Sequence, residues 1–365
     1  PREGMVIDPD SGRIRKVKLP QKASEMTFDM KGHAYFIAGR VVSRFATTDA
    51  GKWREVPFDY GEDRAGRLSV LPTGGGPYHT GGISVTPEGH VVAAVMLGGV
   101  KLPNAERERE RLATLKAHKP WTPMIYPGRG GVLMVRAWDK HGKLVYDDAI
   151  QGIGYCHNVF LDGDDNVYVC SGARRRGYRD VNTGTLVKVR PGSKIVTDSD
   201  PVLPLKGRKP DRPYDTDGGG IGRAWWEGAE WFYGGIGANG KNSGGIHACH
   251  CSQFRIAHDY YARTFVPETV HYSVGVLDSA GNLITRIGQY GNVEDGVPLV
   301  PDPRIPKPRS LGGDEVGFFQ PTYLAVHTDR RLFVNDYGND HIVSVRLGYR
   351  TTERVTVRSG GSGEE

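Results

Sequence analysis

Three groups of histidine, cysteine and tyrosine residues have the side-chain types that hold transition metals or work beside them. They are Tyr78-His79, Tyr155-Cys156-His157 and His247-Ala248-Cys249-His250-Cys251. Imidazole nitrogen and thiolate sulfur together suit zinc, copper or iron, which are borderline or soft ions. If the fold brings the groups together, the sequence predicts a mixed N/S metal site. The candidate ligands are His79, Cys156, His157, His247, Cys249, His250 and Cys251.

A structural role accounts for the same residues. Cysteine is among the most buried residue types, and two cysteines one residue apart on a strand face the same side whatever they do. His157 could equally be a core histidine bonded to the backbone. A disulfide between Cys249 and Cys251 is the weakest option, because an extended strand places their Cα atoms about 6.5–7 Å apart, the outer limit of good geometry.

The elements that must position these residues belong to a phrase that recurs along the chain. Each copy has an apolar strand, a turn with Asp, Gly or Asn, and a second strand rich in aromatic and β-branched residues. Clear copies occupy 254–288 and 321–345, and weaker ones begin near Met26, Ile83, Val159 and Arg223. Further strands are expected over 131–145, 185–196 and 341–357. Six copies and 51 glycines predict an all-β chain with many tight turns.

The last copy carries a resemblance to a known family. The segment Phe333-Val-Asn-Asp336-Tyr-Gly-Asn339-Asp-His341-Ile342 resembles the NHL repeat, whose second strand ends in Val-x-Asp before a turn with Asn and a pair such as Arg-Ile. His341 stands where the family usually has Arg. The resemblance implies a six- or seven-bladed NHL-type β-propeller with four-stranded blades around a channel. First strands line that channel, so the three groups ahead of them are expected to meet at its mouth.

The chain is also distantly similar to peptidyl-hydroxyglycine amidating lyases, which are propellers with zinc-bound channel histidines and a reacting Tyr and Arg. The resemblance implies Tyr78 or Tyr155 as a proton-transfer group and Arg255 or Arg263 as the partner of a substrate carboxylate. The implied metal ligands are His79, His157 and His250.

Other site types find less support in the sequence. Lactonase-like propellers hold calcium with acidic and Asn ligands, but Asp162, Asp164, Asp165 and Asn166 more simply form a turn. The glycine-rich segments at 218–222 and 234–237 lack the strand, helix and Lys context of a phosphate-binding loop.

The sequence predicts three parts: an N-terminal hairpin over 1–20, a propeller over 21–358 and a flexible tail over 359–365. A helical insertion is expected at about 101–128, where strong helix formers follow Asn104. Residues 5–19 have the pattern of the outer two strands of a blade. We expect a protein partner or an upstream segment to complete this half-blade; six closed blades with an extra hairpin is the competing count.

Composition narrows the functions. The net charge of +6 is interspersed along the chain, which indicates a mixed surface rather than a nucleic-acid interface. No apolar run approaches the roughly 18 residues that span a bilayer. The family resemblance favours a secreted or periplasmic protein. Two functions are therefore expected: a binding or scaffold subunit of a larger assembly with a His/Cys metal site at the channel mouth, or a metal-dependent lyase, hydrolase or redox enzyme. A small-molecule ligand is a further expected partner.

Overall fold

The computed structural model describes most of the 365-residue chain. The described residues are 3–8, 10–48, 52–58, 70–73, 76–77, 82–98, 131–153, 156–178, 183–197, 210–217, 223–237, 254–292 and 316–348. They form strands, and their one helical element is the short 3-10 helix η1 (Thr269–His271). No helix among them has the length and apolar character to cross a membrane. The all-β prediction is confirmed, whereas the insertion at about 101–128 and the tail at 359–365 lie outside the described residues.

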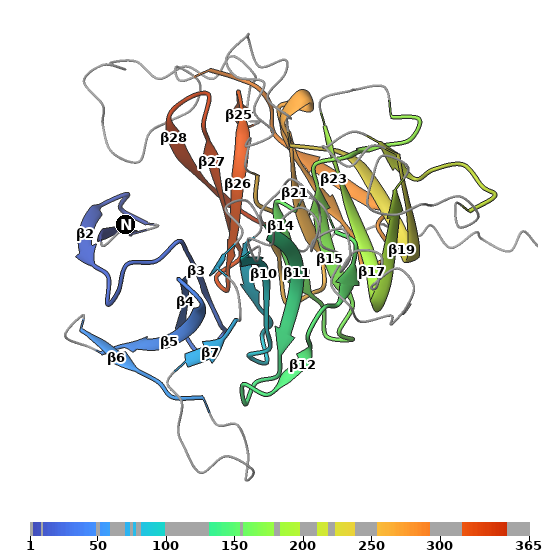
Figure 1. Ribbon diagram of the computed structural model, residues 1–365. Helices are drawn as coiled ribbons and strands as arrows, with labels where there is room; N and C mark the ends of the chain where they lie inside the picture. The colour runs from blue at the N-terminus through green and yellow to red at the C-terminus, as the bar shows by residue number, and fades with distance from the viewer. Residues whose placement is uncertain are drawn as a thin grey trace, which may run out of the picture.

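The strands form successive sheets in a β-propeller arrangement (Figure 1). Within the described ranges, four sheets have at least four strands and a three-stranded sheet follows them. Sheet 1 contains β3 (Glu25–Phe28), β4 (Ala34–Ala38), β5 (Val41–Thr47), β6 (Trp53–Glu55) and β7 (Val70–Pro72). Sheet 2 contains β8 (Gly76–Pro77), β9 (Ile83–Val85), β10 (Val91–Gly98), β11 (Gly131–Trp138) and β12 (Leu144–Tyr146). The six- or seven-blade count stays a prediction.

The remaining sheets continue the arrangement. Sheet 3 contains β13 (Ile150–Gln151), β14 (Asn158–Leu161), β15 (Val167–Ser171), β16 (Arg174–Arg175), β17 (Gly184–Thr197), β18 (Thr216–Asp217) and β19 (Ala224–Ile236). Sheet 4 contains β20 (Ala257–His258), β21 (Thr264–Glu268), β22 (Ser273–Leu277) and β23 (Leu283–Ile287). Sheet 5 contains β26 (Pro321–His327), β27 (Arg331–Asp336) and β28 (His341–Arg346). A short parallel pair, β24 (Gln289–Tyr290) and β25 (Gly317–Phe318), lies between sheets 4 and 5 in the sequence.

The apolar core is divided into layers between neighbouring sheets. Met134 and Val135 are adjacent in β11 and therefore point to opposite faces of sheet 2. Met134 packs with Tyr35 and Phe58 of the sheet 1 region, and Val135 packs with Val167 of sheet 3. Equivalent layers join sheets 3 and 4 and sheets 4 and 5. First strands also lie beside one another, β3 against β9, β9 against β14 and β20 against β26. Such packing brings the starts of these strands toward one axis.

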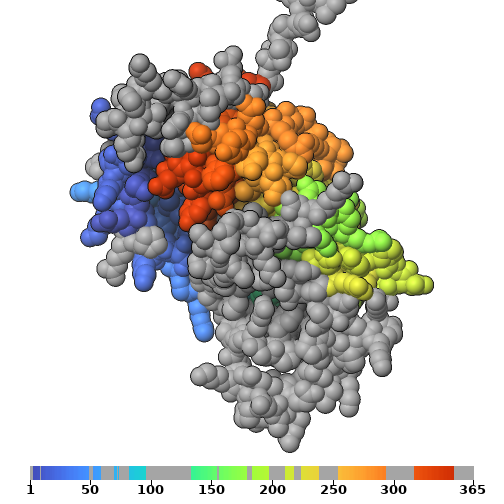
Figure 2. Space-filling view, turned by 90° about the horizontal axis from the view of Figure 1, so that it is seen from above, coloured from blue at the N-terminus to red at the C-terminus, as the bar shows by residue number. Residues whose placement is uncertain are grey.

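The N-terminal hairpin pairs β1 (Glu3–Ile7) with β2 (Ile14–Lys18). Leu19 and Val17 pack in a cluster with Phe36 of sheet 1, and Trp53 Nε1 donates to the carbonyl oxygen of Lys18 at 2.9 Å. The turn of the hairpin contacts sheet 5, because Asp10 forms an ion pair with Arg331 of β27. The two ends of the described chain therefore lie side by side, blue beside red in Figure 2.

One turn type closes many of the hairpins. An Asp side chain accepts the backbone N–H groups of the residues two and four positions on, as Asp29 does from Lys31 at 2.8 Å and His33 at 2.9 Å. The same pair of bonds recurs at Asp139, Asp162, Asp259 and Asp278. The residue at the third position after each Asp has a positive φ, which glycine adopts without strain. The prediction that Asp162 and its neighbours form a turn is confirmed.

The copy predicted to begin near Arg223 is wrong. Residues Ala224–Ile236 form one strand, β19, which pairs antiparallel with β17 as the outer part of sheet 3. Gly228 lies in a register shift of the ladder with φ 90°. A Cβ on Gly228 would lie 2.2 Å from Ser193 Oγ, so the glycine permits close approach of the two strands instead of a turn.

The residues that carry the family resemblance fasten three loops together. Asp336 is fully buried, and its carboxylate accepts the N–H groups of Phe319 at 2.9 Å and Gln320 at 2.6 Å. Asn339 donates to Asp336 Oδ2 at 2.7 Å and to the carbonyl oxygen of Gly291 at 3.1 Å. The Asp and Asn of the phrase therefore have a structural role in sheet 5.

Candidate functional site

Four of the residues with predicted chemistry lie in the described part of the chain: Cys156, His157, Arg255 and Arg263. Arg263 lies in the β20–β21 turn, where its Nε atom donates to Asp259 Oδ2 at 3.0 Å. Cys156 and His157 directly precede β14, and Arg255 precedes β20. These positions are the entries to the first strands of sheets 3 and 4, where the sequence predicts the channel mouth. The other predicted site residues lie outside the described residues; they are Tyr78, His79, Tyr155, His247, Cys249, His250 and Cys251.

Arg255 connects four sheets at this point. Its Nε atom lies 2.8 Å from Glu25 Oε1 at the start of β3, and its Nη1 atom donates to the carbonyl oxygen of His157. Its guanidinium carbon lies 5.9 Å from the ring centroid of Tyr323 in β26. The backbone of Arg255 also forms a bridge to Tyr323. We call Glu25, Asn158, Arg255 and Tyr323 the axis cluster, because one comes from each of sheets 1, 3, 4 and 5.

Among the described residues, sheet 2 approaches the axis cluster through the backbone at Gly82 and Ile83. Gly82 has φ 83°, and a Cβ there would lie 2.8 Å from Asn158 Nδ2 and 3.3 Å from Glu25 Oε1. The Ile83 N–H donates to the Glu25 carboxylate. Burial raises the pKa of Glu25 above its ordinary value, against the opposing effects of Arg255 and of this N–H. The missing side chain at Gly82 lets sheet 2 close against both neighbours.

Asn158 provides the direct contact between sheets 3 and 4. Its Oδ1 atom accepts the N–H of Ile256 at 3.2 Å, and its side chain is buried. A buried amide that bonds to a neighbouring strand fixes the relative position of the two sheets, since leaving that N–H unsatisfied would cost about 1–3 kcal/mol. The axis cluster is therefore a set of polar contacts between sheets.

His157 and Cys156 lie in the wall of this region and not on its surface. The His157 side chain is fully buried, with its ring centroid 4.4 Å from that of Phe254. The backbone N–H of His157 donates to the Cys170 carbonyl oxygen at 2.8 Å. Cys156 Sγ donates to the carbonyl oxygen of Asn158 at 3.2 Å. Burial raises the pKa of the Cys156 thiol to about 12, and it raises that of Cys170 well above its usual range.

These properties limit the chemistry of the described thiols. The nucleophile is the thiolate, and burial keeps the Cys156 thiol protonated at neutral pH in the metal-free chain. Among the described residues no group of three His, Cys, Asp or Glu side chains could hold a metal ion. Cys156 as placed suits a buried packing role, whereas the remaining predicted ligands lie outside the described residues.

Sequence reasoning missed Glu25, Asn158 and Tyr323. Glu25 begins the strand of the copy near Met26, Asn158 begins that of the copy near Val159, and Tyr323 lies in the first strand of the last copy. Their positions follow the rule that selected His157, which looks for functional residues at the entries to first strands. A search for metal-ligand types passed over them, and a search for any polar residue at strand entries would have found Glu25 and Asn158.

The fold and these contacts define a β-propeller with a polar axis. No family model matches the chain, and no curated protein matches it. Among solved structures it is similar to a glucose dehydrogenase, with 11% identity, a TM-score of 0.44 and coverage of 94% of this chain and 90% of that one.

Two further structures show the range of proteins with this likeness. The Cps50 (Swd1) β-propeller domain of Myceliophteria thermophila is 11% identical, with a TM-score of 0.37 and coverage of 94% and 90%. The calcium-binding protein regucalcin of Agrobacterium tumefaciens is 14% identical, with a TM-score of 0.36 and coverage of 91% and 80%. Likeness at this level assigns no activity to the chain.

Proposed function

We propose that the chain is a binding propeller, a scaffold subunit whose protein partner completes the N-terminal half-blade. The observation that carries the proposal is the two-stranded sheet β1–β2. Within the described ranges neither strand pairs with a third one. A two-stranded hairpin is marginally stable in water, and exposed strand edges pair readily with another chain.

The face of the hairpin that carries Met5 exposes apolar side chains beside Lys16. Directly opposite residues in an antiparallel pair share a face, and faces alternate along each strand. Met5 therefore lies on one face with Ile7 and its partner Ile14, opposite the Val17 face that packs toward sheet 1. Met5 is 68% exposed and Ile14 is 61% exposed. A strand added beside the hairpin would bond to an edge that pairs with no other strand in the described ranges, and its own side chains would pack beside Met5 and Ile14.

The test compares lysine substitutions on two strands in the full chain, expressed in its source cells. Met5→Lys with Ile14→Lys should remove a co-migrating protein chain from the propeller in size-exclusion chromatography of a native extract. Ile284→Lys in β23 is the matched control, because Ile284 is 55% exposed on an outer strand of sheet 4. A propeller that migrates alone, or one whose partner survives the double substitution, would refute the proposal.

A metal-dependent lyase, hydrolase or redox enzyme is the second candidate function. It is favoured by the convergence of His157 and Arg255 at the entries to β14 and β20, where a channel-mouth active site is expected. Elemental analysis of the purified chain separates the two candidates. About one tightly held equivalent of zinc, copper or iron, lost in His157→Ala or Cys251→Ala, would favour the enzyme. Metal-free protein that keeps its fold and its partner would exclude it.

A further inference from the structure

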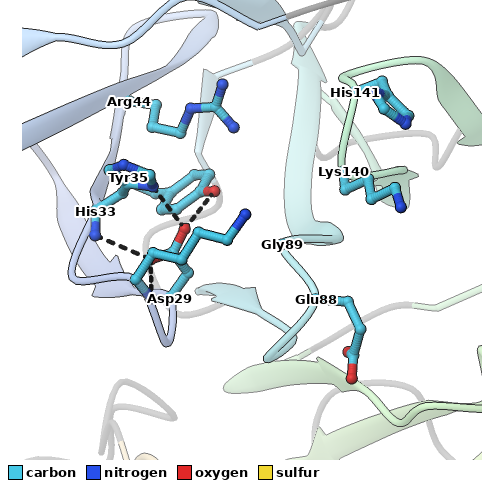
Figure 3. A pocket seen from close by; sticks show the side chains of 9 residues that line it. Asp29, His33, Tyr35, Arg44, Glu88, Gly89, Lys140 and His141 are labelled. Carbon is cyan, nitrogen blue, oxygen red and sulfur yellow. Dashed lines mark hydrogen bonds and ion pairs between the residues drawn. The ribbon is translucent and has the colours of Figure 1, made fainter.

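A pocket of about 380 Å³ lies at the turns of sheets 1 and 2, away from the axis cluster (Figure 3). Its walls come from the β3–β4 turn, the β9–β10 turn, the β11–β12 turn and strands β4 and β5. The volume is in the range of small-molecule sites, which is about 300–1,000 Å³. We call this cavity the rim pocket. Neither the proposed binding function nor the proposed enzyme activity involves the residues of the rim pocket.

The carboxylate in the wall of the rim pocket is satisfied by its own surroundings. Asp29 Oδ1 accepts two N–H groups of its turn, and Asp29 Oδ2 accepts the Tyr35 hydroxyl at 3.0 Å. His33 Nδ1 lies 2.9 Å from the same Oδ2 atom. The Asp29 side chain is only 4% exposed. These contacts hold His33 with Nδ1 toward Asp29, which leaves Nε2 as the ring nitrogen that can meet a ligand.

Arg44 is a fixed cation on another wall. Its Nε and Nη2 atoms donate to the carbonyl oxygens of Val56 and Pro57, and its guanidinium carbon lies 4.4 Å from the Phe58 ring centroid. Stacking and carbonyl contacts hold the head group in one place without neutralising its charge. These two bonds use Nε and one N–H of Nη2, and the guanidinium has further N–H donors that a ligand can meet.

The charge balance of the rim pocket is positive. Lys31, Arg44 and Lys140 supply three permanent cations, and Glu88 is the other carboxylate besides Asp29. Figure 3 shows the Glu88 carboxylate turned away from Arg44 and Tyr35. Lys31 and Lys140 lie in separate turns and Arg44 lies in β5, so their charges suit an anion with oxygens in several directions. A phosphate has this shape, whereas the two oxygens of a planar carboxylate lie on one side of the group.

We propose that the rim pocket binds a small phosphate monoester, with Lys31, Arg44 and Lys140 around the phosphate and His33 Nε2 as a further contact. The inference does not depend on the binding or enzyme functions above. The rigid turns and the stacked Arg44 form the site before the ligand arrives, so little ordering is needed on binding.

The test is calorimetric titration of the full chain with glycerol 3-phosphate. Lys31→Gln combined with Lys140→Gln should weaken binding by roughly thirtyfold, since each of the two cations contributes about 1 kcal/mol in a water-exposed site. Lys16→Gln combined with Lys22→Gln is the matched control, because it removes the same charge from exposed positions outside the pocket. The control should bind as the wild type does.

Three outcomes would overturn the proposal. One is no heat of binding at about 10 mM glycerol 3-phosphate, a concentration well above the dissociation constants of specific metabolite sites. The second is an equal loss in both double variants, which would indicate the overall charge and not the pocket. The third is glycerate binding as tightly as glycerol 3-phosphate, which would show recognition of any small anion. Circular dichroism spectra that match the wild type confirm that the variants are folded.

Discussion

The axis cluster and the rim pocket contain the same three kinds of group and use them differently. Each has a carboxylate, an arginine and an aromatic ring beneath the guanidinium: Glu25, Arg255 and Tyr323 at the axis, and Asp29, Arg44 and Phe58 at the rim. At the axis the carboxylate and the arginine bind each other across sheets. At the rim the carboxylate is bound by the donors of its own turn. The donors around the carboxylate therefore determine whether the nearby arginine holds two sheets together or stays available to a ligand.

The largest expected effect tests Arg255 as a brace. Arg255→Met should lower the free energy of unfolding by about 3–5 kcal/mol, because it leaves Glu25 charged, largely buried and without its partner. Arg44→Met should cost only about 1 kcal/mol, since it removes stacking and leaves Asp29 satisfied. Urea unfolding at pH 7 measures both, with Arg190→Met, 76% exposed, as the surface control. Equal losses for Arg255 and Arg44 would contradict the distinction.

The second prediction concerns Asp148, a buried carboxylate whose described hydrogen bonds come from backbone N–H groups. Asp148 is 8% exposed, and burial raises its pKa to about 7 despite N–H groups from Val135 and Ile150. A raised pKa means that the folded state holds the proton of Asp148 more tightly than the unfolded state does. The contribution of this group to the free energy of unfolding is therefore complete below about pH 4 and is lost as the pH rises toward 7. Asp148→Asn should therefore be more stable than the wild type by about 3 kcal/mol at pH 8.

At pH 4 the Asp148→Asn variant should differ little from the wild type. Guanidinium unfolding across this pH range measures the slope, and Asp164→Asn at an exposed turn position is the control. A wild-type curve as flat as that of the variant between pH 4 and 8 would mean that Asp148 ionises freely in the folded chain.

Glycines at the two regions provide the third test. Gly82→Ala should cost about 2 kcal/mol or more, because it adds left-handed strain to a contact with Asn158 and Glu25. Gly32→Ala in the rim turn should cost about 1 kcal/mol, since Gly32 has φ 78° but nothing lies within 4 Å of its Cβ position. Thermal unfolding of the pair separates strain from crowding, and identical midpoints would show that the axis is not tightly closed.

The smallest effect is expected at Tyr35. Tyr35→Phe removes one of the hydrogen bonds to Asp29 and should lower stability by about 1 kcal/mol. Burial is the main reason that the pKa of Tyr35 rises to about 12, so this hydroxyl should stay protonated well into the alkaline range. Thermal unfolding of the wild type and of Tyr35→Phe measures the loss of stability, and ultraviolet titration of the same two proteins measures the pKa of Tyr35. A tyrosine missing from the variant's titration near pH 10 would contradict the buried placement.

The sequence was informative where the structure is local. The strand-turn-strand copies near Met26, Ile83 and Val159 and the two clear copies were readable, because alternation and Asp turns lie within a few residues. The segment after Arg223 was misread, because its glycines suggest a turn and only the distant ladder with β17 shows a strand. Long-range pairing leaves no local pattern.

The same limit applies to the axis. The strand-entry rule led to His157 and the family resemblance led to Arg255, yet Glu25 and Arg255 are 230 residues apart and meet only because the sheets close around the axis. No spacing in the sequence records that contact. The rim pocket was missed for a related reason, since Lys31 and Lys140 lie in two separate turns that each look like an ordinary solvent-exposed loop, and Arg44 lies in strand β5.

The recurring Asp turn has a consequence for how such a chain could arise. Because the Asp fixes the turn from within a few residues, each hairpin sets its own register without help from its neighbours. A duplicated or exchanged stretch of gene that encodes one hairpin would therefore fold with its strands already aligned. The contacts at the axis would need further mutations, because each new sheet requires a residue there that bonds to the neighbouring sheets.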